Sequence, residues 1–388
     1  MSRPLKVLIY LFFPAGGIGR YTHEVLLELA KFEDLEIEVV CLPEFQWRDQ
    51  SFYQTWPNLR SISHPNPIVR KARFLIGQWV NPRRLVRRAR EFDADIVHIC
   101  QINHLTRPWW MPKLVGSKAR LLASAHDVKR AKAILCKPWE AAQLQRFYQD
   151  CDAIFVHGHA QELELMEFAR PDRARIVEVP FGPYAYPEPA ESERELREKY
   201  GIPAERRVLL FFGNIRDDKN LQGFLTALAK QPSAPHLIVA GRFGGGHHRS
   251  LDSYNRHIQH LGLTERVHIL NRFIQDEEVG GLFKLADCAV LPYEKNFTSQ
   301  SGVLHVAAAF ECPVLCTPTE MFSDTLRNGA IGELCHGFDD EALSEGLARI
   351  VHRMEHGPSF RFEGYREQNS WARNAAITRE TYYALAGG

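Results

Sequence analysis

Hydrophobic and polar positions alternate along the chain between two kinds of segment. Short runs of strand length are almost wholly apolar, and the longer segments that follow them repeat their apolar residues with helical spacing. The runs are KVLIYLF, LEIEVVCL, ADIVHIC, RLLASAHD, CDAIFVHG and RIVEVP, then RVLLFFG, HLIVAG, RVHIL, CAVLPY and CPVLCT. Strands and helices in this order predict parallel sheets covered by helices on both faces. Two such sets predict an α/β fold with two Rossmann-like, doubly wound domains.

The boundary between the two sets lies in the segment VPFGPYAYPEPAESERELREKYG, which carries four prolines and then becomes highly charged. Such a segment is typical of an extended linker that leads into a new helix. We therefore expect one domain over residues 1–185, a second over 186–365 and a final helix over 366–388. The final helix needs a surface on which to pack, because one of its stripes carries Trp371, Ala375, Thr378, Tyr382 and Leu385.

Composition excludes several classes of protein. The 388 residues are 45% hydrophobic with a formal net charge of +1, which gives no global bias toward nucleic acid. No apolar run approaches the ~20 residues that span a bilayer, and the N-terminal run is interpreted as a first strand and not as a signal peptide. The eight cysteines have no zinc-ligand spacing. We expect reduced thiols, a cytoplasmic location, no metal and no cofactor.

Ligands of parallel sheets bind at the carboxyl ends of the strands, so the turns after the strands are the candidate sites. The first such turn, FFPAGGIGRY, places Gly16 and Gly17 before a helix, where a ligand can approach the backbone closely. Its spacing is not GxGxxG, and a simple tight turn explains it equally well.

The turn in FFGNIRDDKNL places Gly213 at the end of a strand, and Arg216 and Lys219 before the next helix. Two cations at a helix N-terminus oppose the helix dipole unless an anion lies between them, and a diphosphate is the natural occupant. The alternative is that Asp217 and Asp218 neutralise both cations as solvated ion pairs.

Two further turns complete the set. In LPYEKNFTSQSGVLHVAAAFECPVL a helix is predicted to begin near Ser301 and Gly302, where backbone N–H groups can bind phosphate or sugar hydroxyls. A bare N-cap explains these residues nearly as well. The fourth turn, in VAGRFGGG, opens at Gly241.

The order of landmarks resembles the family-4 retaining glycosyltransferases of GT-B architecture. These landmarks are GGIGRY, ADIVHIC, SAHD, CDAIFVHG, VEVPFG, FFGNIRDDKNL, LIVAG, LFKLADCAVLPY, SGVLHVAAAFECPVL and SWARNAA. The resemblance implies two Rossmann-like domains that face each other across a cleft, with a nucleotide-sugar bound by the C-terminal domain and an acceptor presented by the N-terminal domain. It also implies that the last helix crosses back to the first domain.

The same resemblance implies roles for individual residues. Arg216 and Lys219 are expected to neutralise the donor diphosphate, and His126 in SAHD is expected to lie beside the transferred sugar; these three are the predicted catalytic residues. The predicted donor-binding residues are Gly16, Gly17, Gly213, Gly241, Glu294, Ser301, Gly302 and His305. The predicted acceptor-binding residues are Arg20, Tyr21 and Asp127.

The chain departs from the family at one motif. The family has two glutamates separated by seven residues around the third turn, and here Phe297 and His305 occupy those positions. Glu294 lies three residues upstream and can reach the same cleft, and His305 can offer a ring nitrogen to a ribose hydroxyl. The departure keeps open a glycosyltransferase-like scaffold without catalysis. A nicotinamide-dependent oxidoreductase is a remote alternative, because GGIGRY lacks the required glycine spacing.

The expected reaction moves a sugar from a UDP- or GDP-sugar to an acceptor hydroxyl, in the synthesis of a cell-envelope polysaccharide, exopolysaccharide or glycolipid. Its main task is to stabilise the charge that grows on the leaving diphosphate. The resemblance implies no dependable protein nucleophile, so no catalytic base is assigned. The Asp-x-Asp pair, Asp93 and Asp95, is interpreted as a helix-to-strand turn, and no metal requirement is expected.

One segment bears on the acceptor and on location. The segment NPIVRKARFLIGQWVNPRRLVRRAR contains no acidic residue. Its basic residues are Arg70, Lys71, Arg73, Arg83, Arg84, Arg87, Arg88 and Arg90. It can contact anionic lipid headgroups at the inner face of a membrane or an acceptor's phosphate. Trp109 and Trp110 can anchor at an interface or stack on sugars. The alternative is a solvated helix face with both tryptophans in the core. The expected acceptor is a saccharide or a lipid-linked saccharide.

Overall fold

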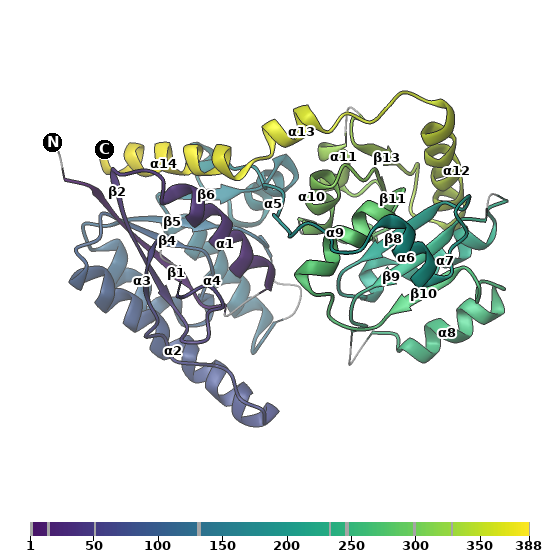
Figure 1. Cartoon of the computed structure of the whole chain (residues 1–388). Coiled ribbons are helices and arrows are strands. Elements are labelled where there is room, and N and C mark those ends of the chain that lie inside the picture. Colours follow the sequence, from purple (N-terminus) through teal and green to yellow (C-terminus); the bar gives the residue numbers. More distant parts are fainter. Residues whose placement is uncertain are drawn as a thin grey trace. The chain divides into compact units, whose positions relative to one another are not determined.

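The computed structural model divides the chain into two compact units (Figure 1). Unit 1 comprises Met1–Phe181 and Ser370–Gly388, and unit 2 comprises Gly182–Asn369. The expected boundaries, after residues 185 and 365, each lie four residues from the observed ones. The structure describes residues 3–13, 16–49, 52–129, 133–232, 234–244, 248–297, 300–326 and 329–387.

Unit 1 is built on a seven-stranded sheet in the order β3-β2-β1-β4-β5-β6-β7, whose paired strands run parallel. The strands are β1 (Leu5–Leu11), β2 (Leu35–Cys41), β3 (Gln54–Trp56), β4 (Ile96–Ile99), β5 (Arg120–Ser124), β6 (Ala153–Val156) and β7 (Ile176–Glu178). The helices are α1 (Gly16–Leu29), α2 (Pro67–Glu91), α3 (Arg107–Val115), α4 (Lys137–Asp150), α5 (His159–Ala169) and α14 (Trp371–Gly387), with 3-10 turns at His104–Thr106 and Arg173–Arg175. The strand order reverses between β1 and β4, where such sheets bind ligands.

Alternate residues of β1 serve the two faces of this sheet. Leu8 and Tyr10 join the core that α2, α3 and α4 cover. Helix α14 packs against α1, and its Asn374 donates hydrogen bonds to the Tyr21 hydroxyl (2.9 Å) and the Pro180 carbonyl (2.7 Å). The predicted stripe on this helix is confirmed for four residues, since Trp371, Ala375, Thr378 and Tyr382 are buried. Leu385 is half-buried.

Unit 2 contains a six-stranded sheet in the order β10-β9-β8-β11-β12-β13, also with parallel pairs. The strands are β8 (Val208–Phe212), β9 (His236–Ala240), β10 (Val267–Leu270), β11 (Cys288–Leu291), β12 (Val314–Cys316) and β13 (Gly332–Leu334). The helices are α6 (Glu193–Tyr200), α7 (Leu221–Ala229), α8 (Leu251–His260), α9 (Asp276–Leu285), α10 (Gly302–Ala309), α11 (Glu320–Thr325), α12 (Asp340–His356) and α13 (Glu363–Gln368), with a 3-10 turn at Asp217–Lys219. Here the order reverses between β8 and β11.

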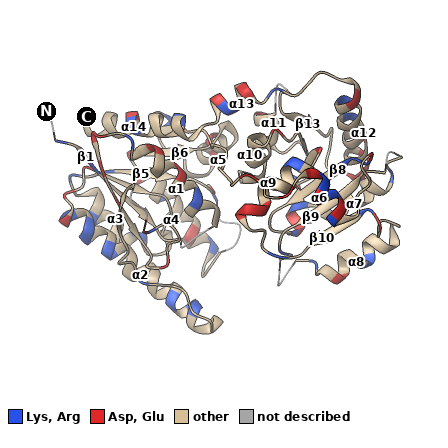
Figure 2. Cartoon of the chain, in the orientation of Figure 1, with Lys and Arg blue, Asp and Glu red and all other residues tan. Residues whose placement is uncertain are grey.

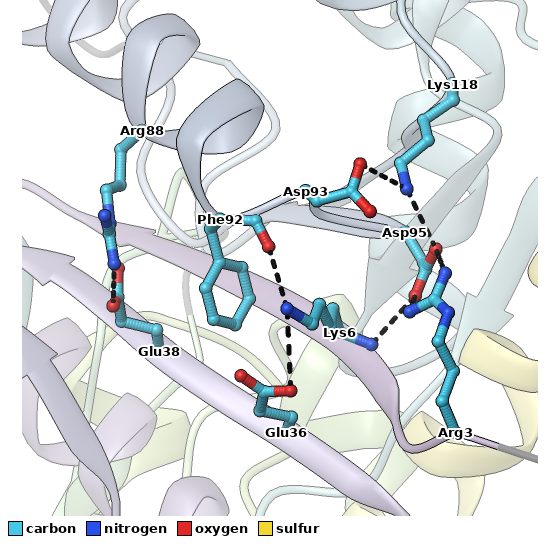
Figure 3. Close-up of polar contacts among 9 residues, drawn as sticks. All are labelled: Arg3, Lys6, Glu36, Glu38, Arg88, Phe92, Asp93, Asp95 and Lys118. Carbon is cyan, nitrogen blue, oxygen red and sulfur yellow. Dashed lines mark hydrogen bonds and ion pairs between the residues drawn. The ribbon is translucent and has the colours of Figure 1, made fainter.

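The Asp-x-Asp pair lies just before the amino end of β4 in unit 1, and Figure 3 shows its polar contacts. Asp93 pairs with Lys118 at 2.6 Å, and this hydrogen bond holds the pKa of Asp93 below its usual value. Asp95 pairs with Arg3 at 2.7 Å and accepts a hydrogen bond from the Lys6 backbone at 3.0 Å. The pair lies between α2 and β4, so its interpretation as a helix-to-strand turn is confirmed.

Three properties of the described residues complete the picture. No helix among them is both long and apolar enough to cross a membrane. All eight cysteines are free, and seven are buried; Cys136 is exposed. Within the same described ranges, no three His, Cys, Asp or Glu side chains lie close enough together to hold a metal ion.

Candidate active site

The turns after β8 and β9 meet backbone to backbone. Gly213 has φ +93° and its N–H donates to the Ala240 carbonyl at 2.9 Å. Gly241 has φ +148°, and a β-carbon placed on it would lie 2.0 Å from the Gly213 carbonyl oxygen. Only glycine at position 241 permits this approach. The predicted donor-binding glycines 213 and 241 are therefore brought together at the carboxyl edge of the sheet.

The turn after β11 joins the same group. The Glu294 N–H donates to the Asp218 carbonyl at 2.9 Å, which ties this turn to the one after β8. The Nζ atom of Lys219 lies 5.3 Å from the centre of the Tyr293 ring. Since β8 and β11 flank the reversal of strand order, these residues occupy the position where open α/β sheets bind ligands.

Lys219 is a buried cation. Lys219 is only 8% exposed. Burial is the main cause that lowers its pKa, to about 8, and the nearby charge of Arg216 is the second cause. The charge of Asp218 has the opposite effect on the pKa. Within the described part of the chain, no carboxylate lies within ion-pair distance of its Nζ atom. A buried ammonium without a paired anion is costly, so this position favours an anionic ligand.

The two aspartates of this turn pair with other groups. Asp218 pairs with Arg216 at 2.9 Å, and Asp217 pairs with Arg249 at 3.2 Å. The neutralisation alternative is therefore confirmed for Arg216 and wrong for Lys219. The Nε atom of Arg216 and one carboxylate oxygen of Asp218 are buried without a hydrogen-bond partner among the described residues. An arginine in this state retains N–H groups for an incoming phosphate.

Ser301 precedes α10 as predicted, but its side chain does not cap the helix. The Oγ atom lies 3.2 Å from the Tyr293 hydroxyl, and both residues are buried. The bare N-cap alternative is therefore wrong for the side chain. Gly302 lies close to the ring of Tyr184: a β-carbon at position 302 would be only 3.3 Å from that ring.

The two residues that stand where the family has glutamates, Phe297 and His305, each contact another side chain. Phe297 contacts the Tyr293 ring at 4.5 Å between centres. His305 is 4% exposed, and its Nδ1 atom lies 2.9 Å from the Tyr365 hydroxyl. A ribose contact by His305 would have to use the other ring nitrogen, and it stays a prediction. Glu294 is half-buried, and its backbone is bonded to the turn that carries Arg216 and Lys219.

Unit 1 has a small cavity of about 70 Å³ at the carboxyl ends of β1, β4 and β5. Ser124, His126 and Asp127 line it after β5, and Gln101 lines it after β4. This cavity also lies where the strand order reverses. The predicted His126 and Asp127 therefore lie at the carboxyl edge of the sheet of unit 1, where open α/β sheets bind ligands.

The structure fixes the tautomer of His126. Burial lowers the pKa of both His126 and His157 to about 3, so both rings are neutral at pH 7. The Val179 carbonyl can only accept, so His157 Nδ1 donates to it at 3.3 Å and leaves His157 Nε2 as an acceptor. His126 Nδ1 then donates to His157 Nε2 at 3.1 Å. The buried His126 Nε2, without a partner among the described residues, is therefore a hydrogen-bond acceptor.

The remaining predicted residues of unit 1 lie in or beside α1. Gly16, with φ +84°, and Gly17 begin this helix, and both are exposed. Arg20 lies 3.6 Å from the Glu24 carboxylate. Tyr21 is 3% exposed, because the rings of His126, His157, Phe181 and Trp371 surround it. Tyr21 thus packs in the core of unit 1, and the expected contact with an acceptor stays a prediction.

Sequence reasoning missed two residues of the site. The ring of Tyr293 lies beneath the Lys219 ammonium, and its hydroxyl is hydrogen-bonded to Ser301. The position of Tyr293 directly after the apolar run CAVLP was the sequence signal that could have found it. His157 fixes the tautomer of His126, but it lies 31 residues away in the sequence. No local pattern links these two histidines.

Comparisons with known proteins agree with this geometry. The sequence profile of the Glycosyltransferase Family 4 matches residues 15–182, and that of the Glycosyl transferases group 1 matches residues 192–366. The D-inositol 3-phosphate glycosyltransferase of Mycolicibacterium smegmatis is 24% identical over 294 residues, which are 74% of this chain and 67% of the relative. Matches to the Mycobacterium relatives span little more than half of their length, 55–56%.

Solved structures share the fold at low identity. Sucrose-phosphate synthase from Thermosynechococcus elongatus has a TM-score of 0.75 at 14% identity, with 99% of each chain covered. Anabaena HepE in complex with UDP and glucose has a TM-score of 0.75 at 14% identity, with 99% of this chain and 100% of that chain covered. The two profiles together match most of the sequence, and the two parallel-sheet units have the GT-B fold. The chain therefore belongs to the GT-B glycosyltransferases, with a family 4 domain followed by a group 1 domain.

Proposed function

We propose that the chain moves a glycosyl group, with retention of configuration, from a nucleotide-diphosphate sugar bound by unit 2 to a hydroxyl group of an acceptor bound by unit 1. The observation that carries the proposal is Lys219, a buried cation that lacks a carboxylate partner in the described chain and lies beside Arg216. A diphosphate supplies the charge that this position lacks. UDP is the favoured nucleotide, because HepE, which shares the fold, was solved with UDP; GDP is the alternative.

The proposed reaction needs no charged base from the protein. The bond between the anomeric carbon and the phosphate oxygen breaks, and the acceptor oxygen bonds to that carbon on the same face. The hydroxyl proton passes to the departing phosphate oxygen. Negative charge grows on the diphosphate, and Lys219 and Arg216 stabilise it more strongly in the transition state than in the ground state. His126 accepts a hydrogen bond from a sugar hydroxyl through Nε2.

Glu294 is proposed to take the role of the missing second glutamate. Its backbone is fixed to the diphosphate turn by the bond to Asp218, and its half-buried carboxylate can accept hydrogen bonds from ribose hydroxyls. Glu294→Gln is expected to weaken nucleotide binding roughly tenfold, because a charged acceptor is replaced by a neutral one. Lys219 supplies a positive charge without a carboxylate partner in the described chain, and Arg216 supplies further N–H groups, so we also propose that binding needs no divalent metal.

The acceptor is proposed to be a saccharide or a lipid-linked saccharide. Two features support a hydroxyl-rich ligand: Gln101, Ser124, His126 and Asp127 line the cavity of unit 1, and His126 offers a neutral acceptor atom. The named relatives act on D-inositol 3-phosphate, which is also rich in hydroxyl groups. We place the reaction in the cytoplasm, in the synthesis of an envelope polysaccharide or glycolipid.

Calorimetric titration with UDP, GDP and ADP in the absence of metal tests the proposal. One nucleotide should bind saturably, and Arg216→Ala with Lys219→Ala should abolish that binding. The matched control changes two exposed, ion-paired cations of unit 2, Arg194→Ala with Lys284→Ala, and should bind as the parent does. If none of the three nucleotides binds to the folded parent protein, the transferase proposal is wrong and a scaffold role is favoured.

A further inference from the structure

Three tryptophans from three different helices form one exposed cluster in unit 1. Trp79 of α2, Trp109 of α3 and Trp139 of α4 have ring centres 4.5 and 6.4 Å apart, in that order. Their exposed fractions are 40%, 46% and 41%. Trp110, by contrast, is buried in the core, so the core alternative for the two tryptophans is confirmed for Trp110 and wrong for Trp109. Helix α3 contacts both α2 and α4, which brings the three rings together.

Further exposed apolar side chains lie close to these tryptophans in the sequence. Ile76 lies one turn before Trp79 on α2 and is 42% exposed, and Ile134 and Leu135, just before α4, are 39% and 71% exposed. The backbone holds the last two outward: the buried Glu140 carboxylate accepts hydrogen bonds from the N–H groups of Ile134 (2.8 Å) and Leu135 (2.6 Å). We call these three residues and the three tryptophans the tryptophan surface. A group of exposed apolar side chains such as this one is typical of an interaction site.

Basic residues border the tryptophan surface. The Arg83 guanidinium lies 5.5 Å from the Trp79 ring centre, one turn further along the same face of α2. Lys113 of α3 and Lys137 of α4 are exposed near Trp109 and Trp139 in the sequence. Helix α2 has no acidic residue before its last position, Glu91. Figure 2 shows Lys and Arg along α2 and α3.

Exposed tryptophans together with basic residues indicate which kind of partner binds this surface. Tryptophan is enriched at the boundary between lipid headgroups and acyl chains, because its ring is apolar and its N–H is polar. Lysine and arginine around it are attracted to anionic headgroups. A protein partner would not require cations on all three helices around the rings.

We propose that the tryptophan surface and its bordering cations dock unit 1 on an anionic lipid bilayer, with Trp79, Trp109 and Trp139 inserted at the headgroup level. The docking does not depend on which nucleotide unit 2 binds. It would bring the cavity of unit 1 to acceptors that are carried in the membrane.

Vesicle flotation of the full chain tests this proposal. Vesicles of phosphatidylcholine and phosphatidylglycerol at 3:1 should bind the protein, vesicles of phosphatidylcholine alone should bind it at least tenfold less, and 0.5 M salt should reverse the binding. The variant Arg83→Gln, Lys113→Gln, Lys137→Gln should bind roughly a hundredfold less, since each basic residue at the surface contributes about a fivefold factor.

The triple variant Trp79→Ala, Trp109→Ala, Trp139→Ala should also lose binding and should lose quenching of tryptophan fluorescence by brominated lipid. The matched control removes exposed aromatic rings elsewhere, at Phe52, Phe273 and Tyr383, and should bind vesicles as the parent does. Nucleotide titration and circular dichroism confirm that each variant is folded. Equal binding to neutral vesicles, or no binding to either kind, overturns the proposal. Loss of a concentration-dependent dimer in the tryptophan variant, without vesicle binding by the parent, would assign the surface to a second copy of the chain.

Discussion

The charge state of Lys219 predicts a specific pH dependence of nucleotide binding. Its pKa in the free protein is about 8, against an ordinary value of 10.5, because the ammonium is buried beside Arg216. The difference corresponds to about 3 kcal/mol by which the free protein disfavours the charged form. A bound diphosphate removes this penalty and returns the pKa to its ordinary range or above, so nucleotide binding is coupled to proton uptake.

The sign follows from proton counts. Below pH 8 the free protein already carries the proton and affinity is constant, whereas above pH 8 each pH unit costs about a factor of ten. The dissociation constant for UDP should therefore be roughly tenfold larger at pH 9 than at pH 7. At pH 8 about half a proton should be taken up per nucleotide. The same depressed pKa means that folding stability rises as pH increases from about 8 to 10.5, because the unfolded chain then binds the extra proton.

Calorimetry in buffers of different ionisation enthalpy measures both quantities. Lys219→Met should bind UDP more weakly, with no change in affinity between pH 7 and pH 9. Lys284→Met, which removes an exposed lysine paired with Glu188, should keep the parent's pH profile. Burial raises the pKa of Tyr293, which keeps the ring beneath Lys219 neutral across this range. A flat profile in the parent protein, or an unchanged slope in Lys219→Met, would refute the assignment.

Three further outcomes are expected. Gly241→Ala should lower the melting temperature and weaken UDP binding, because its β-carbon would meet the Gly213 carbonyl oxygen; an unaltered melt by calorimetry would contradict the close approach. His157→Phe should lower kcat roughly tenfold with unchanged UDP affinity, since His126 loses the acceptor that fixes its tautomer, and His157→Gln should recover part of kcat. Activity assayed in excess EDTA should equal that with added Mg²⁺, and strict metal dependence would disprove metal-independent charge neutralisation.

Much of the fold was predictable from apolar periodicity, because eleven of the thirteen strands in the described residues coincide with the apolar runs of the sequence. The two missed strands, β3 and β13, are three residues long and lie at sheet edges. Neither has a continuous apolar run, because an edge strand packs less of its surface. Pairing with a neighbour, and not local sequence, defines such strands.

The site was predictable where its residues share one turn and unpredictable where they meet across the fold. Arg216 and Lys219 lie three positions apart, and helix-dipole reasoning found them. The distinction between them, one paired and one unpaired, depends on where Asp217 and Asp218 point. The burial of Tyr21 was not predictable, because the residue that holds its hydroxyl, Asn374, lies 353 positions away. The meeting of Trp79, Trp109 and Trp139 is a product of helix packing in the same way.

The return of α14 to unit 1 has a consequence for synthesis on the ribosome. Unit 2 is one continuous segment, whereas unit 1 is completed only by Ser370–Gly388. Chains emerge from the N-terminus and domains fold as units, so unit 2 can finish folding while one face of the first sheet still lacks its last helix. Until α14 emerges, Tyr21 lacks the amide of Asn374 and the face beside α1 is uncovered. The face beside α1 therefore stays exposed in the nascent chain until residues 370–387 have been synthesised and can pack on it.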